Sequence, residues 1–103
     1  MKEFPDRENS RDNPPRVTTP DELGRLARSR RKASGLTLQD VSDTTRLGLR
    51  FLSEFERGKP NASLGRVLQA LEALGLDVLV LPREHSDRLL RAARQRRPPG
   101  TGP

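Results

Sequence analysis

Apolar residues recur at helical spacing through the middle of the chain, and the first such stretch begins near residue 20. Leu23, Leu26 and Ala27 lie three and four positions apart, which is the spacing of one helix face. Thr19 and Glu22 form a Thr-x-x-Glu capping box, in which each side chain accepts a hydrogen bond from the other residue's backbone amide. The pattern therefore predicts a helix that begins directly after Thr19.

The next segment, residues 36–58, divides into two short helical stretches joined by a tight turn. Thr37 and Asp40 form a second capping box, with Asp in the usual Glu position. Leu52 and Phe55 lie three apart in the second stretch, so we expect them to face the core. Two short helices around a tight turn are the layout of a DNA-binding helix-turn-helix, whose second helix lies in the major groove.

A fourth helix is predicted after Ser63, because serine is a residue type that caps helix N-termini. A stripe of apolar residues at spacings of three and four indicates a helix that packs one face against a core. The residues expected in this stripe are Leu64, Val67, Leu68 and Leu71.

The run at residues 76–81 changes period, is rich in valine and leucine, and stops at Pro82, which predicts a strand. No other stretch of the sequence predicts one, and a lone strand cannot satisfy its own backbone groups. Pairing with the same strand of a second copy across a two-fold axis satisfies them. The alternative is an extended tail packed on the core of a monomer. The residues expected in the dimer strand are Leu76, Val78, Leu79, Val80 and Leu81.

The two ends of the chain differ in composition from this central part. Residues 1–19 are polar, contain three prolines and show no periodicity, so we expect a disordered N-terminal segment. Residues 82–103 hold six basic and two acidic side chains and form a basic tail, in which a helix from Ser86 to Arg97 is expected. The folded domain with its dimerisation strand is accordingly assigned to residues 20–81.

Composition excludes several classes of protein. The 103 residues are 31% hydrophobic with a mean hydropathy of -0.82, which suits one small domain with a modest core. No run approaches the roughly 20 apolar residues of a membrane helix, and the N-terminus lacks the apolar segment of a secretory signal. We therefore expect no membrane partner and a cytoplasmic, nucleoid-associated location.

Charge and reactive side chains narrow the function further. The chain has no cysteine and one histidine, His85, so neither a metal site nor nucleophile–base catalysis is expected. We accordingly expect no cofactor and no enzymatic activity. The net charge of +6 favours a polyanionic partner, for which double-stranded DNA is the natural candidate.

Short motifs follow one another in a recognisable order through the central part of the chain. They are LGRL at 23–26, RRK at 30–32, GLT at 35–37, FLSEFERGK at 51–59, VLQAL at 67–71 and the run at 76–81. With these motifs the chain resembles the Cro/CI-like (Xre) helix-turn-helix family, and within it the HipB-type antitoxin repressors.

The resemblance implies an all-α, lambda repressor-like bundle of four to five helices with one C-terminal β-strand. It also implies that this strand forms a two-stranded sheet between the protomers of a homodimer, to which a HipA-like kinase toxin binds. Two positions depart from the family pattern. Leu38 replaces a phosphate-contacting Gln, and Arg46 replaces a left-handed Gly in the turn at a cost of about 1 kcal/mol.

By the same resemblance, the N-terminal end of the third helix carries residues that face DNA bases. Arg50 is the strongest candidate, because its guanidinium can reach O6 and N7 of guanine together. Leu49 can contact a thymine methyl, and Glu54 can accept from cytosine N4. The alternatives are a solvated arginine and a carboxylate that repels phosphate. The full set of expected base-contacting residues is Gly48, Leu49, Arg50, Ser53 and Glu54.

Phosphate contacts are expected from helix N-termini and neighbouring cations. The candidates are Thr37, Gln39, Arg46, Arg57 and Lys59, with Lys59 and Arg46 the strongest. The resemblance gives Arg31 and Glu56 a different role, as an internal ion pair between the first and third helices. A DNA contact is the alternative for this pair.

These expectations combine into one leading function and two alternatives. The leading one is a sequence-specific transcriptional repressor that binds a palindromic operator as a dimer and, by resemblance alone, is the autoregulating antitoxin of a HipA-like kinase. One alternative is a stand-alone Xre-family regulator without a toxin. The other is a helix-turn-helix protein-interaction module that does not bind DNA, which Leu38, Leu49 and Glu54 on the DNA-facing side make conceivable.

Overall fold

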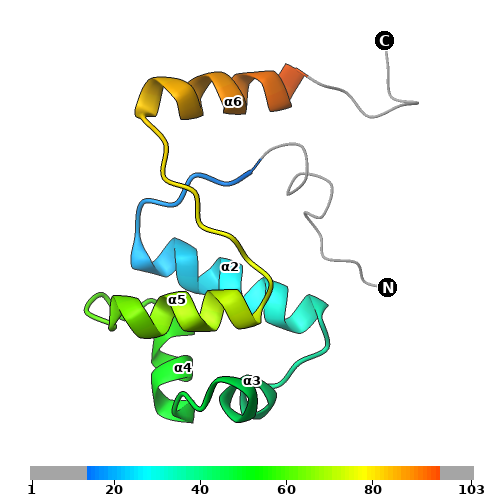
Figure 1. Cartoon of the computed structure of the whole chain (residues 1–103), viewed down its shortest axis with the longest axis vertical. Helices are drawn as coiled ribbons and strands as arrows, with labels where there is room; N and C mark the ends of the chain where they lie inside the picture. Colours follow the sequence, from blue (N-terminus) through cyan, green and yellow to red (C-terminus); the bar gives the residue numbers. More distant parts are fainter. Residues whose placement is uncertain (1–13, 96–103) are drawn as a thin grey trace. The chain divides into compact units, whose positions relative to one another are not determined.

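A computed structural model describes residues 14–95, and within that range the chain is all-helical and contains no strand (Figure 1). Its helices are α2 (Pro20–Ala33), α3 (Leu38–Thr45), α4 (Leu49–Glu56), α5 (Leu64–Ala73) and α6 (Arg83–Gln95). None of the helices in the described range is long and apolar enough to cross a membrane.

The described residues divide into two compact units. Val17–Asp77 form the first, which contains α2 to α5. Residues 14–16 and 78–95 belong to the second, which contains α6. In the second unit, the guanidinium of Arg16 donates to the Ser86 hydroxyl at 2.9 Å and to the Asp87 carboxylate at 2.6 Å. The hydrogen bond from Arg16 lowers the pKa of Asp87, so this carboxylate stays ionised at neutral pH.

Both predicted capping boxes are present and begin α2 and α3 where the sequence indicates. The Thr19 hydroxyl accepts from the Glu22 amide at 3.1 Å while the Glu22 carboxylate accepts from the Thr19 amide at 3.1 Å. Thr37 and Asp40 repeat the arrangement at 3.0 and 2.8 Å. Backbone hydrogen bonds from Thr18 and Thr37 lower the pKa values of Glu22 and Asp40 respectively. These caps therefore stabilise the fold at neutral pH and are lost as the carboxylates are protonated in acid.

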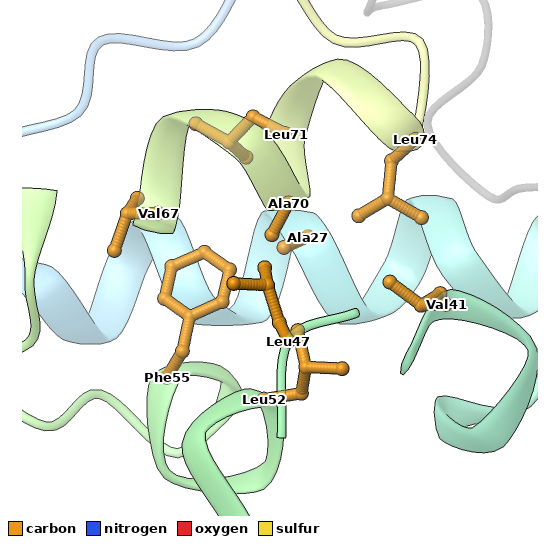
Figure 2. Packing of buried hydrophobic residues seen from close by; sticks show 9 residues of the cluster. All are labelled: Ala27, Val41, Leu47, Leu52, Phe55, Val67, Ala70, Leu71 and Leu74. Atoms are coloured by element: carbon orange, nitrogen blue, oxygen red, sulfur yellow. The ribbon is translucent and has the colours of Figure 1, made fainter. Parts of the chain in front are cut away.

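The core of the first unit lies where α2, α3, α4 and α5 meet (Figure 2). Leu52 and Phe55 of α4 are buried as predicted, and α4 packs against both α2 and α3. The turn residue Leu47 is buried too, which anchors the connection between α3 and α4. The complete buried apolar set is Ala27, Val41, Leu47, Leu52, Phe55, Val67, Ala70, Leu71 and Leu74.

The predicted apolar stripe of α5 is partly wrong. Leu64, at the first helical position, is 70% exposed and Leu68 is 44% exposed, so neither belongs to the packed face. Spacings of three and four are shared by neighbouring helix faces, so the pattern alone cannot choose between them. The face that packs on the core consists of Val67, Ala70, Leu71 and Leu74.

The segment predicted as a strand has no strand hydrogen bonding in the single chain. Leu79 is 76% and Val80 is 91% exposed, so an apolar tail packed on the core does not describe these two side chains. Pairing with a second copy stays a prediction.

The start predicted for the last helix is also wrong. The helix begins at Arg83 instead of Ser86, because the amides of His85 and Ser86 both donate to the Pro82 carbonyl at 3.0 Å and so begin the helix one turn earlier. The Ser86 hydroxyl donates to the Arg83 carbonyl at 3.0 Å and lies inside α6. The predicted end at Arg97 lies outside the described residues.

Gly24 allows α2 to approach α4 closely, and we predict that Gly24→Ala destabilises the fold. An added Cβ would lie 2.5 Å from the Phe55 carbonyl oxygen and 2.7 Å from that of Glu56. Because these are backbone atoms, the helices must move apart, at a cost of about 1–3 kcal/mol. Urea unfolding of the wild type and the variant measures this difference.

Gly65→Ala in α5 is the matched control, since a Cβ there meets nothing within 4 Å. Alanine favours a helix over glycine by up to about 1 kcal/mol, so this variant should be neutral or stabilised. Equal stabilities of the two variants would show that the approach of α2 to α4 is not tight.

Candidate nucleic-acid interface

The N-terminal end of α4 is open to solvent and carries no side-chain cap. Gly48 is the N-cap residue, and its backbone angles (φ -67°, ψ 147°) suit any residue. A Cβ at this position would meet no atom within 4 Å, so the fold itself does not require glycine. The first amides of α4 therefore face a space that a ligand backbone can enter closely, and they form an electropositive helix end.

The five residues predicted to contact bases come together on this end of α4. Leu49 is exposed, and the side chain of Arg50 is 92% exposed. Ser53 and Glu54 lie one helical turn further along and are half-buried. With Gly48 at the start, they form one continuous surface, which we call the α4 face: Gly48, Leu49, Arg50, Ser53 and Glu54.

Glu54 forms ion pairs with two cationic side chains. Its Oε1 accepts from Nζ of Lys59 at 3.0 Å, and its Oε2 accepts from Nε of Arg50 at 3.3 Å. The Lys59 hydrogen bond, followed by that of Arg50, lowers the pKa of Glu54. The carboxylate is therefore ionised at neutral pH and neutralises part of the positive charge on the α4 face.

The expected phosphate-contacting residues are all exposed, but some of their side chains already form hydrogen bonds within the protein. The Thr37 hydroxyl accepts from Asp40 as part of the capping box, and the Gln39 amide donates to Asp43 at 2.9 Å. Arg46 and Arg57 are the C-cap residues of α3 and α4, and neither has a side-chain ion pair within residues 14–95.

The turn between α3 and α4 is fixed by side-chain hydrogen bonds that sequence reasoning missed. Arg46 has φ 67°, so a non-glycine residue occupies the left-handed position as expected. The Ser42 hydroxyl donates to the Leu47 carbonyl at 2.7 Å. The Thr45 hydroxyl donates to the Val41 carbonyl at 2.7 Å and accepts from the Leu47 amide at 3.1 Å. Small hydroxyl residues beside the turn were the available signal.

Arg31 and Glu56 form the ion pair implied by the resemblance. Nε and Nη2 of Arg31 donate to the two carboxylate oxygens of Glu56 at 2.7 and 3.0 Å, and both side chains are buried. Nη1 donates to the Leu36 carbonyl at 2.8 Å. Hydrogen bonding to Glu56 raises the pKa of Arg31. This one guanidinium thus links α2, the loop before α3 and the end of α4.

Two further arginines hold the bundle in ways the sequence did not indicate. Nε of Arg30 donates to the Leu74 carbonyl at 2.9 Å, which satisfies a free carbonyl at the end of α5. The guanidinium of Arg66 lies 5.9 Å from the ring centroid of Phe51, whose ring stacks on Phe55 at 6.3 Å. These contacts connect the two ends of α5 to α2 and α4.

We predict that Arg31→Ala lowers the free energy of unfolding by about 3–5 kcal/mol, because it leaves the buried Glu56 carboxylate without its partner. Arg28→Ala, at an exposed position of the same helix, is the control and should be nearly neutral. Replacing both partners, as Arg31→Met with Glu56→Leu, should recover much of the loss. Thermal and urea unfolding measure all three variants. A near-neutral Arg31→Ala would show that the pair does not stabilise the fold.

Residues 22–83 match the family described as a helix-turn-helix domain. The chain belongs to this helix-turn-helix family. Its fold is similar to that of the solved structure described as "HipB-O4 20mer complex", with a TM-score of 0.62 and 19% identity over 66% of this chain and 96% of that one. The predicted Cro/CI-like fold resembling HipB is confirmed.

Two relatives are similar in sequence. The chain is 39% identical over 66 residues to the uncharacterized HTH-type transcriptional regulator y4mF of Sinorhizobium fredii (strain NBRC 101917 / NGR234). This match covers 64% of this chain and 87% of y4mF. It is 35% identical over 72 residues to the transcriptional regulator ClgR of Mycobacterium tuberculosis (strain ATCC 25618 / H37Rv). That match covers 70% of this chain and 64% of ClgR.

Proposed function

We propose that this protein is a sequence-specific DNA-binding transcriptional regulator that represses by occupying an operator. The observation that carries the proposal is the α4 face, an exposed and uncapped helix end bearing a 92% exposed arginine. The buried Arg31–Glu56 pair and the hydrogen-bonded turn hold this face rigidly, as reading a groove requires. Two similar proteins are described as transcriptional regulators, which supports this class of function.

In this proposal α4 enters the major groove and its exposed side chains read the base edges. Arg50 pairs with O6 and N7 of a guanine, and Leu49 contacts a thymine methyl. Gly48 allows the DNA backbone to come close, while Ser53 and Glu54 are further candidates for base contacts. Phosphates are bound by the exposed residues around this face: Thr37, Gln39, Arg46, Arg57 and Lys59.

The protein is proposed to act as a homodimer. Leu79 is 76% and Val80 is 91% exposed, and residues 77–81 make no backbone hydrogen bond within the described range 14–95. Pairing with a second copy would cover these side chains and satisfy the backbone groups. The proposed strand comprises Leu76, Val78, Leu79, Val80 and Leu81. A two-fold axis would place the two α4 helices in successive major grooves of a palindrome, about 34 Å apart.

A kinase toxin related to HipA is the proposed protein partner, and the protein would then be its autoregulating antitoxin. The similarity to HipB in fold and the motifs between residues 23 and 81 support this role. Copurification of the neighbouring gene's product with the dimer would test it, and its absence would favour a stand-alone regulator.

We propose no enzymatic activity, because the family that matches is described as a helix-turn-helix domain and the relatives as transcriptional regulators. The hollow of about 300 Å³ beside α2 and α5 is lined mainly by apolar side chains, with Lys59 its one charged residue. No group of three or more His, Cys, Asp or Glu side chains within residues 14–95 could hold a metal ion.

We predict that the protein binds DNA from its own promoter region more tightly than scrambled DNA, and that this preference survives moderate salt. Fluorescence anisotropy at two salt concentrations measures it. Arg50→Gln should weaken promoter binding about 5- to 150-fold, because it removes one bidentate base contact, with a smaller loss on scrambled DNA, where only a phosphate contact is removed.

Arg28→Gln carries the same charge change on α2 and should leave the preference intact. Equal, salt-labile binding of the wild type to both DNAs would contradict the proposal. It would favour the protein-interaction module instead.

For the dimer, we predict that Leu79→Glu with Val80→Glu yields a monomer whose promoter affinity falls about 100-fold or more, because the two half-sites are no longer bound together. Light scattering and anisotropy measure the two effects. Leu64→Glu alters another exposed leucine outside the segment and serves as control. A monomer with undiminished promoter affinity would show that dimerisation is not required.

A further inference from the structure

Glu54 is the one acidic side chain on the α4 face, and it lies between two cations that could otherwise contact DNA. A carboxylate near phosphate is unfavourable, because the two negative charges repel each other. Glu54 nevertheless lies beside Arg50 and Lys59. Its two carboxylate oxygens are divided between the cations, one oxygen for each. Glu54 is also only 25% exposed, whereas Arg50 is 92% exposed.

The two ion pairs differ in how firmly they are held. Lys59 is bound twice, because its backbone amide donates to the Glu54 carbonyl at 3.0 Å and its ammonium donates to the carboxylate at 3.0 Å. Arg50 makes one longer contact of 3.3 Å. The order of the pair along the helix, with the cation N-terminal to the acid, is also the weaker orientation. Arg50 can therefore leave Glu54 while Lys59 remains and continues to neutralise the carboxylate.

We propose that Glu54 is an internal counter-ion that competes with DNA for Arg50 and Lys59, and so lowers the affinity of the α4 face for DNA of any sequence. The inference rests on the proposed function, because it assigns Glu54 a part in the affinity of the same surface for DNA. It differs from the direct reading of a cytosine, in which Glu54 itself would contact a base.

Arg50 must leave the Glu54 carboxylate before its guanidinium can contact DNA. On the operator, the guanidinium exchanges one carboxylate oxygen for two acceptors of a guanine, which is a favourable exchange. On non-cognate DNA the guanidinium finds only phosphate. In both complexes Arg50 gives up Glu54, so the loss of that ion pair offsets part of the attraction on either DNA. Non-specific affinity comes mainly from cations that displace counterions from phosphates, so each neutralised cation lowers it.

The test is Glu54→Gln, which keeps the shape of the side chain and removes its charge. We expect the affinity for scrambled DNA to rise roughly two- to fivefold, the effect of one exposed charge interaction. Affinity for promoter DNA should rise by at least the same factor, because Arg50 also leaves Glu54 when it contacts the operator. The slope of log affinity against log salt on scrambled DNA should become more negative by about 0.9, which corresponds to one additional phosphate contact.

Glu72→Gln is the matched control, because it makes the same change in net charge at an exposed residue of α5 with no ion pair in the described part of the chain. It should alter both affinities by the same factor and leave the preference unchanged. Equal effects of the two variants would overturn the inference, since only net charge would then matter. A loss of promoter affinity in Glu54→Gln with unchanged scrambled binding would overturn it in favour of a base contact.

A double-mutant cycle separates action through the two cations from a structural effect. In a background of Arg50→Gln with Lys59→Gln, Glu54→Gln should raise the affinity for scrambled DNA no more than Glu72→Gln does. An undiminished rise would overturn the inference. If the wild type shows no preference for promoter DNA, the proposed function is overturned. The effect of Glu54→Gln on the affinity for scrambled DNA still tests the role of Glu54 as counter-ion. If the wild type binds neither DNA, both are overturned.

Discussion

The Arg31 guanidinium is the contact on which the arrangement of the helices depends. It binds both oxygens of Glu56 at the end of α4 and the Leu36 carbonyl in the loop before α3. Burying two charges is costly unless their hydrogen-bonding groups are satisfied, and no buried side-chain nitrogen or oxygen among the described residues is left without a partner. The Arg31–Glu56 pair therefore holds the end of α4 against α2, and this contact fixes the direction of α4.

Two further features hold α4 in place. One is its close approach to α2 at Gly24, and the other is the burial of its apolar side chains. The backbone of α2 contacts that of α4 where Gly24 has no side chain, while Leu52 and Phe55 fill the core on the other side. The turn before α4 is held by Ser42 and Thr45. With both ends fixed in this way, the exposed end of α4 is presented without reorganisation, which lowers the entropic cost of binding a groove.

Charge on the α4 face is balanced and not simply positive. Glu54 lies between Arg50 and Lys59, so the net charge of this surface depends on which of these ion pairs is formed. Basic residues alone bind any polyanion, and discrimination between sequences needs contacts that form on one sequence and not on another. The Arg50–Glu54 contact of 3.3 Å is longer than the Lys59–Glu54 contact of 3.0 Å, so Arg50 is the cation that is more readily released.

The sequence by itself determined the features that depend on neighbours along the chain. The caps at Thr19 and Thr37 rest on contacts within a few residues, and the buried Leu52 and Phe55 follow from spacing on one short helix. The left-handed position of Arg46 was expected from the resemblance. The resemblance supplied the Arg31–Glu56 pair, whose partners lie 25 residues apart.

Only the tertiary structure decided which face of α5 is buried. Adjacent faces of the helix satisfy the same spacing of apolar residues, and packing against the other helices determines which of them is covered. It also placed Lys59 against Glu54, because the chain reverses at Gly58, with φ 90°, beyond the end of the helix where no spacing rule applies.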